Sequence, residues 1–326
     1  MIVPTYWAEA RTQRREQNRQ VTVRRFGWSD ESHAAAQAHA EVRAAEALEA
    51  IWCGNKALLR REPKLAYNGA QGTPIREEII ARQGQAVVTR NAYGAHCLNT
   101  PDVLFADIDF PDKPALRYSL VLFGILIAIT VASYWIAQWR WVGVFLGVVA
   151  VLASGPLTTA AYRAVLAARG GAEKVARSRL TEFAAQRPQW NFHLYRTPAG
   201  FRAVATHQLF DPADPAVANC FAQLRVDPVY ALMCRNQQCF RARVSAKPWR
   251  IGIGAHMRPR PGVWPVAPER MGVRRAWVEQ YEARASAFAA CRFIESIGSG
   301  SVHADVRPVL EWHDALSGAR TERPLA

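Results

Sequence analysis

The 326-residue sequence has little lysine: 36 of its 41 basic residues are Arg, against 27 acidic residues. Its six cysteines form no CxxC pair, which argues against a zinc site, and we find no internal repeat. Half of the residues are hydrophobic and 21% are charged, a composition that excludes a disordered chain. The sequence therefore encodes a folded protein of net charge +14, long enough for one large domain or two ordinary ones.

Charge is absent from two neighbouring runs, Tyr118–Ala137 and Trp141–Ala161. Twenty helical residues reach about 30 Å, the hydrocarbon thickness of a bilayer. The pattern predicts a two-helix transmembrane hairpin over residues 118–161; the alternative is a helical hairpin buried in a soluble core. Basic residues flank the runs and only Arg140 lies between them, so the positive-inside rule predicts a two-pass protein of the bacterial inner membrane with both termini cytoplasmic.

The polar segments on either side, residues 1–117 and 162–326, each look incomplete. The first ends in a strand with little helix to cover it, and the second begins with a helix that needs a sheet to pack on. We therefore expect one discontinuous cytoplasmic α+β domain, with helices on an antiparallel sheet, interrupted by the hairpin. Cysteines on that side of a membrane are expected to be reduced thiols, although Cys234 and Cys239, with His207 and His256, leave a zinc site open.

Hydrophobic periodicity and turn residues indicate the main elements of the polar segments. Helices are predicted over about 30–52, 74–83 and 270–297, the second on the strength of an acidic pair, Glu77-Glu78, near its start. Strands are predicted at 20–26, 86–90, 103–110, 190–196, 201–206 and 239–245. Residues 247–268, rich in Pro, Gly, Trp and Arg, should form an ordered but irregular loop.

Asp107 and Asp109 are two residues apart at the end of a predicted strand, so their side chains point to the same face. Two such carboxylates repel unless a divalent cation lies between them. This arrangement predicts a Mg²⁺ or Mn²⁺ site of the kind used in phosphoryl and glycosyl transfer. The alternative is a solvated strand end.

The positive charge is concentrated in the second polar segment, whose net charge is +11 against +2 for residues 1–117. Its candidate phosphate-binding residues are Arg196, Arg202, Arg241, Arg243 and Lys247, and Trp249 and Trp264 lie among its basic residues. Arginine pairs with phosphate oxygens and aromatic rings stack on bases, so a nucleotide or nucleic acid is the predicted partner. Anionic lipid headgroups of the bilayer and simple coding bias are the alternatives.

The order of these motifs resembles the catalytic core of the archaeo-eukaryotic primase-polymerase superfamily. Asp107 and Asp109 match its first motif and Asp227 its third metal-binding acid, whereas Arg202 stands where the family has His. Ser299–His303 with Asp314 is an alternative match for the later motifs. The resemblance implies an RRM-like sheet and nucleotidyl transfer in which Asp107, Asp109 and Asp227 hold the metal.

These patterns together predict a membrane-anchored cytoplasmic protein that binds a nucleotide or nucleic acid. The enzyme that the resemblance implies is a divalent-metal-dependent nucleotidyltransferase. Two alternatives stay open: a DxD-type glycosyltransferase, and a non-enzymatic inner-membrane protein with a basic face for lipid or a partner.

Overall fold

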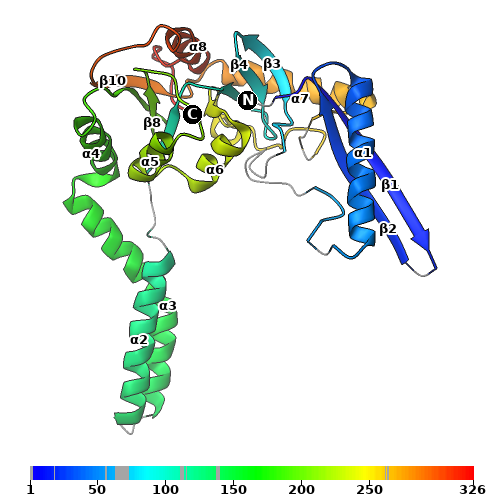
Figure 1. Ribbon diagram of the computed structural model, residues 1–326. Coiled ribbons are helices and arrows are strands. Elements are labelled where there is room, and N and C mark those ends of the chain that lie inside the picture. The colour runs from blue at the N-terminus through cyan, green and yellow to red at the C-terminus, as the bar shows by residue number, and fades with distance from the viewer. Residues whose placement is uncertain are drawn as a thin grey trace. The chain divides into compact units, whose positions relative to one another are not determined.

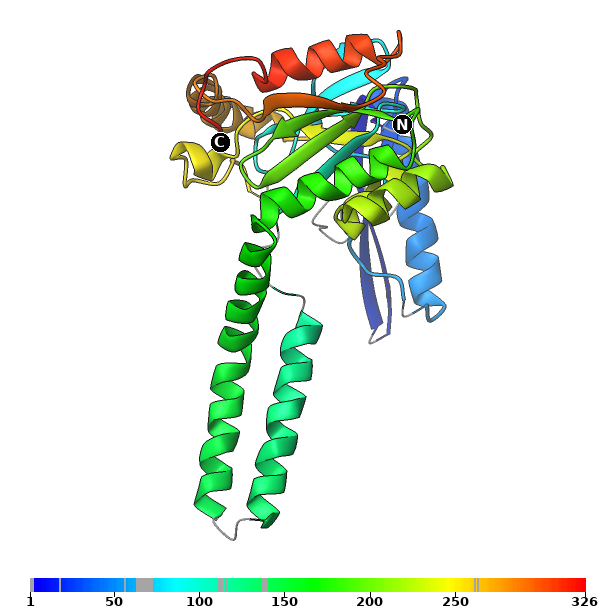
Figure 2. The same cartoon turned by 90° about the vertical axis from the view of Figure 1, so that its left-hand side faces the viewer.

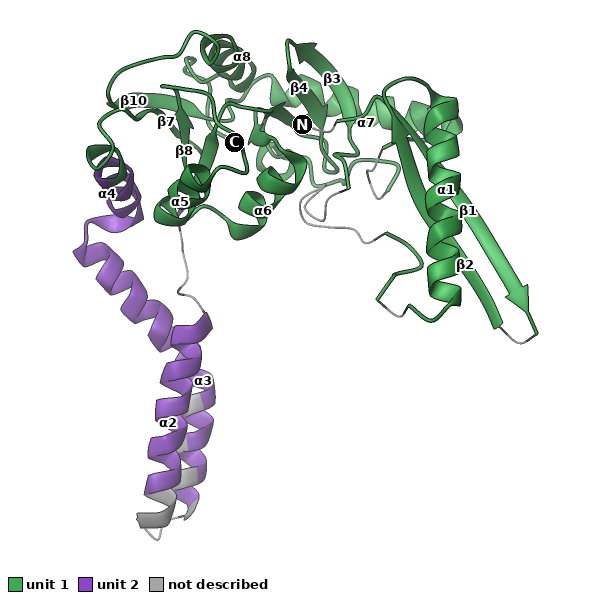
Figure 3. Cartoon of the chain, in the orientation of Figure 1, with its two compact units in different colours: residues 1–108, 183–326 green, residues 109–182 purple. Residues whose placement is uncertain are grey.

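The computed structural model describes residues 3–17, 19–55, 57–62, 73–110, 114, 116–136, 140–260, 262 and 264–326. The chain forms two compact units, residues 1–108 with 183–326, and residues 109–182 (Figure 3). The first unit is an α+β structure that contains three antiparallel sheets.

The first sheet is a two-stranded ribbon, β1 (Tyr6–Glu16) and β2 (Arg19–Ser29), paired from Tyr6↔Ser29 to Glu16↔Arg19. Helix α1 (His33–Trp52) lies along this ribbon (Figure 1) and starts at Ser32, whose hydroxyl accepts from the Ala35 amide. Small buried residues let the helix approach closely. A Cβ on Gly27 would lie 2.2 Å from the Ala40 nitrogen, so only glycine fits there.

The other two sheets of this unit have four strands each. One has the order β3-β4-β5-β9 and the other β10-β7-β8-β6. Their strands are β3 (Glu78–Gln83), β4 (Ala86–Arg90), β5 (His96–Thr100), β6 (Phe105–Asp109), β7 (Asn191–Arg196), β8 (Gly200–Ala205), β9 (Phe240–Arg243) and β10 (Arg292–Gly298). Besides α1, the α-helices that lie wholly in the first unit are α5 (Pro215–Leu224), α6 (Pro228–Gln237), α7 (Met271–Ala285) and α8 (Arg307–Ser317).

The predicted fold, a single antiparallel sheet interrupted by a transmembrane hairpin, is wrong. Consecutive strands separate into different sheets, because β5 pairs with β9 whereas β6 joins β8. The predicted helix over 74–83 is strand β3 instead. The predicted helix over 270–297 ends at Ala285, and its last residues form β10. Strand β10 pairs with β7, far earlier in the sequence, which local periodicity does not report, whereas β3 forms a hairpin with the neighbouring β4.

The second unit contains two helices side by side, α2 (Leu116–Ile136) and α3 (Arg140–Ala168), followed by α4 (Gly171–Ala185), which continues into the first unit (Figure 2). Large apolar side chains such as Leu120, Ile125 and Phe145 are exposed on this pair. Gly170 and Gly171, at the junction of α3 and α4, both have positive φ.

The transmembrane prediction is corrected by these helices: within the described residues, none is long and apolar enough to cross a bilayer. The prediction counted missing charges, but uncharged residues are not all apolar. Thr130, Ser154 and Thr158 are polar, and α3 also contains Pro156. The membrane anchor, the two-pass inner-membrane location and the functions built on them are withdrawn with it. The turn of the predicted hairpin, residues 137–139, lies outside the described residues.

Glu282 of helix α7 contacts two residues of the β3-β4-β5-β9 sheet, Arg90 on β4 and His96 on β5. One carboxylate oxygen, Oε1, accepts from Arg90 Nη2 at 2.7 Å and lies 3.0 Å from His96 Nε2. Burial would raise the pKa of Glu282, but His96 and Arg90 lower it to about 2. This contact therefore favours the folded state whenever Glu282 is ionised.

The sign of this effect predicts a loss of stability in acid. A carboxyl whose pKa is lower in the folded state stabilises the fold above its unfolded pKa, near 4.5, and loses that contribution as the pH falls toward 2. We expect thermal melts between pH 5 and pH 2 to show a smaller decline for Glu282→Gln than for the wild type. An identical decline in the two proteins would contradict the role given to Glu282.

The division into units predicts that the first folds without the helical pair. Replacing residues 110–170 by a Gly/Ser linker of about 20 residues, which spans about 25 Å on average, keeps β6 and α4 whole. We expect one cooperative unfolding transition in calorimetry and circular dichroism. A protein without a cooperative transition would show that the helical pair is part of the same folding unit.

Candidate functional site

Asp107 and Arg202, predicted to bind metal and phosphate respectively, lie together and neutralise each other. Arg202 on β8 donates from Nε and Nη2 to the two carboxylate oxygens of Asp107 on β6, at 2.7 and 3.1 Å. The Arg202 side chain is 2% exposed and that of Asp107 is 42% exposed. Burial lowers the pKa of Arg202, but the charge and hydrogen bonds of Asp107 raise it above its usual value. Arg202 is therefore a permanent cation that is held within the protein.

The remaining amino group of Arg202 connects this pair to a second buried cluster. Nη1 donates to the Arg243 carbonyl at 2.9 Å and lies 3.2 Å from Nε2 of His313 on α8. Because a guanidinium can only donate, His313 Nε2 accepts, and its proton is on Nδ1, 3.0 Å from Asp314 Oδ1. Burial raises the pKa of Asp314, but the hydrogen bonds from His313 and Arg320 bring it below its usual value.

Cys291 completes an arrangement that the sequence did not indicate. Its sulfur lies 3.8 Å from His313 Nε2, so Cys291, His313 and Asp314 are arranged like a nucleophile, a base and an orienting acid. Cys291 is completely buried, however, and Arg202 already donates to the nitrogen that would act as the base. We therefore interpret the cluster as a structural network. In the sequence this network corresponds to a single Cys and an adjacent His-Asp pair, which are patterns too short to identify it.

The predicted metal site includes two further acids, Asp227 and Asp109. Asp227 is the N-cap of α6, where Oδ1 accepts from the Val229 amide at 2.8 Å. Asp109 is the last residue of β6, two residues after Asp107. No cluster of three His, Cys, Asp or Glu residues in the described part of the chain is placed to hold a metal. The metal-binding prediction is corrected accordingly, because the carboxylate of Asp107 is used by Arg202.

The other predicted phosphate ligands have different surroundings. Arg241 is almost completely buried and pairs with Glu77 at 2.6 Å, and Arg243 donates to the Ser245 carbonyl at 2.8 Å. Arg196 lies at the end of β7. Lys247 places its ammonium 5.4 Å from the ring centre of Trp249. Of these four side chains, Lys247 alone is shown against an exposed aromatic ring.

A basic, aromatic surface lies around Lys247, on the segment 247–260. Pro248, Ile251, Ile253 and Met257 are buried, whereas Trp249, His256, Arg258 and Arg260 are exposed. Ile251, Ile253 and Met257 pack into a cluster with Trp277 and Tyr281 of α7. We call this segment the basic loop.

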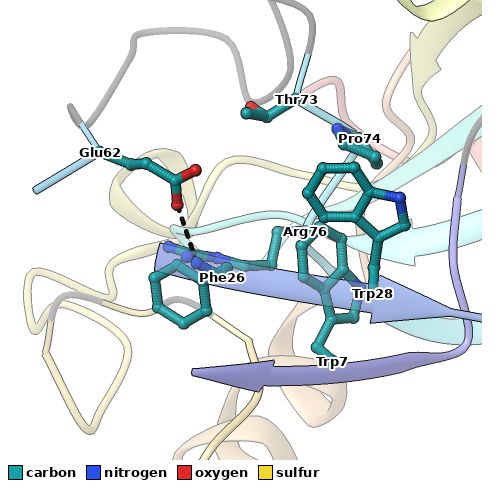
Figure 4. A pocket seen from close by; sticks show the side chains of 7 residues that line it. All are labelled: Trp7, Phe26, Trp28, Glu62, Thr73, Pro74 and Arg76. Carbon is teal, nitrogen blue, oxygen red and sulfur yellow. Dashed lines mark hydrogen bonds between the residues drawn. The ribbon is translucent and has the colours of Figure 1, made fainter. Parts of the chain in front are cut away.

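A second aromatic group lines a pocket on the ribbon (Figure 4). Trp7 and Trp28 are register partners on β1 and β2, with ring centres 5.5 Å apart. The guanidinium of Arg76 lies 3.5 Å from the ring centre of Phe26 in the same pocket. The sequence does not indicate this site, because its residues come from separate segments.

No protein-family model, no curated protein and no solved structure matches the chain. The resemblance to the primase-polymerase superfamily is thus based on the short motifs alone, and the acids that carry it have the contacts described above.

The Asp107–Arg202 pair predicts the effect of removing the carboxylate. Asp107→Asn leaves a buried guanidinium without its counter-charge, so we expect the free energy of unfolding to fall by about 3 kcal/mol. Urea denaturation measures this change. Asp305→Asn, at a side chain that is 73% exposed, is the control and should change stability by less than about 0.5 kcal/mol. An Asp107→Asn protein more stable than the wild type would instead indicate a carboxylate under repulsion, as in an empty metal site.

Proposed function

We propose that the protein binds single-stranded nucleic acid through the basic loop. The observation that carries the proposal is Trp249, a 56% exposed tryptophan in the middle of a basic segment. Bases stack on such rings whatever their sequence, and each stacked base contributes about 1–3 kcal/mol.

The charge around Trp249 is of one sign over a long segment. Residues 228–268 contain seven Arg or Lys residues and no Asp or Glu. Arg241 and Arg243 are used inside the fold, but Arg258 and Arg260 are exposed on the basic loop. Arg284 of α7, also exposed, donates to the Gly252 carbonyl at 2.9 Å and adds a further cation beside the loop. Such a surface attracts the phosphate groups of a single strand.

The basic loop is preformed, because hydrogen bonds and packing within the protein fix its conformation. The Ile253 amide donates to the Pro248 carbonyl at 2.9 Å, and the indole of Trp277 donates to the Ala255 carbonyl at 3.1 Å. Tyr93 contacts the Trp249 ring edge-on, with ring centres 5.2 Å apart. A preformed platform loses little conformational entropy on binding, which favours affinity.

Fluorescence anisotropy with a labelled single-stranded oligonucleotide tests this function. Trp249→Ala should weaken binding at least fivefold because the stacking surface is lost, whereas Trp249→Phe keeps a ring and should retain most of the affinity. Equal affinities for the wild type and Trp249→Ala would contradict the proposal.

The salt dependence of the same titration tests the phosphate contacts. Arg258→Gln with Arg260→Gln should reduce the slope of log K against log salt by about 1.4, since each single-strand phosphate contact contributes about 0.7. Arg11→Gln with Arg15→Gln removes two exposed arginines of β1 and is the matched control. A control pair that lowers the slope as much as the loop pair would show that the charge acts without a defined site.

A further inference from the structure

The pocket on the ribbon is independent of the basic loop and shares no residue with it. Its walls come from both strands of the ribbon and from the segments around residues 62 and 74 (Figure 4). The principal lining residues are Trp7, Phe26, Trp28, Glu62, Pro74 and Arg76. It is an aromatic recess with one cation and one carboxylate.

Arg76 is the unusual member of this recess. Its guanidinium stacks on Phe26, yet it makes no hydrogen bond or ion pair with any residue in the described ranges. Burial lowers the pKa of Arg76, an effect that the charges of Glu62 and Glu9 only partly oppose. Withdrawing an unpaired cation from water is unfavourable. A site that contains a partly buried cation without a counter-charge is therefore suited to bind an anion.

Glu62 does not supply that anion. Its carboxylate lies 2.8 Å from Arg43 Nη2 and accepts from the Phe26 amide at 3.2 Å. With the charge of Glu62 offset by Arg43, and with aromatic and aliphatic groups forming the other walls, the recess carries about one net positive charge. A monoanion therefore matches the charge of the recess better than a phosphate dianion, whose second charge would have no partner there.

The size of the recess sets a second limit on the ligand. It offers about 50 Å³, which at 10–15 Å³ for each water-sized sphere holds roughly four such groups. A carboxylate and the start of its carbon skeleton fit, whereas a whole nucleotide does not. The planar guanidinium also matches a carboxylate with two parallel hydrogen bonds.

We propose that this pocket binds the carboxylate group of a small organic acid, with Arg76 as its charge partner and Trp28 against the body of the acid. The indole of Trp7 donates to the Pro4 carbonyl at 3.2 Å and is fixed in place. The ligand needs no metal or nucleic acid, so the two binding activities can succeed or fail separately.

Isothermal titration of the full-length protein with benzoate tests the site. Benzoate, whose carboxylate would enter the recess while its ring lies at the mouth against Trp28, should bind with one-to-one stoichiometry. Benzyl alcohol, which has the same ring without the charge, should bind at least tenfold more weakly. Inorganic phosphate should also bind more weakly than benzoate. Equal binding of benzyl alcohol, tighter binding of phosphate or no binding of benzoate would each overturn the proposal.

Two variants separate a ligand-binding role of Arg76 from a structural one. Arg76→Met should weaken benzoate binding at least tenfold while the ligand-free protein melts at the same or a higher temperature, because a desolvated charge has been removed. Arg76→Lys keeps the charge but loses the two-pronged contact, so its affinity should be intermediate. Arg15→Met, at an exposed position of β1, should bind benzoate as the wild type does. Unchanged affinity in Arg76→Met, or a lower melting temperature of that ligand-free variant, would contradict the assignment.

Discussion

The buried guanidinium of Arg202 is the contact on which the first unit depends most. It joins Asp107 on β6, the carbonyl of Arg243 on β9 and His313 on α8, and so it connects two different sheets and a helix. Burying an ion pair costs desolvation energy that its attraction barely repays, so such a pair contributes little net stability. The pair itself lies within one sheet, and the hydrogen bond from Arg202 to the Arg243 carbonyl is what reaches the other sheet. It does fix relative positions, because a different arrangement of the two sheets would leave this buried donor without a partner. We infer that Arg202 specifies how the two four-stranded sheets meet.

Buried pairs of an arginine and a carboxylate recur in the fold and explain much of the preference for Arg over Lys. Arg241 pairs with Glu77, and Arg274 with Glu78, each carboxylate lying more than 160 residues away in the sequence. A planar guanidinium can satisfy several acceptors at once and keeps its charge when buried, which a lysine does less well. Part of the positive charge that suggests phosphate binding in the sequence is therefore internal. The arginines to be considered for function are those that the fold does not use.

This distinction limits what the sequence could predict. The Ala-rich helix α1 and the hairpin of β7 and β8 follow local rules of spacing, capping and turns, and both were predicted. Glu77 and Glu78 look like the acidic first turn of a helix, and their true roles depend on Arg241 and Arg274. The predicted metal site failed for the same reason, since the partner of Asp107 lies 95 residues further on. Periodicity reports which face of an element is buried but not which charge it will meet there.

The two candidate binding sites share one physical feature, a cation held against an aromatic ring, and differ in how much of it the solvent reaches. At the basic loop the ring of Trp249 is exposed and Lys247 lies beside it, with further arginines along the segment. An open surface of this kind suits a long, flexible polyanion, because each unit of the polymer can stack and pair in turn. At Arg76 the cation is partly buried against the ring of Phe26, and the space is small. The lower local dielectric strengthens the interactions of a partly buried cation, but such a cation can bind only a ligand that fits the recess, so it selects by size and charge rather than by length. The degree of burial, more than the residue types, therefore assigns these two similar pairs to different ligands.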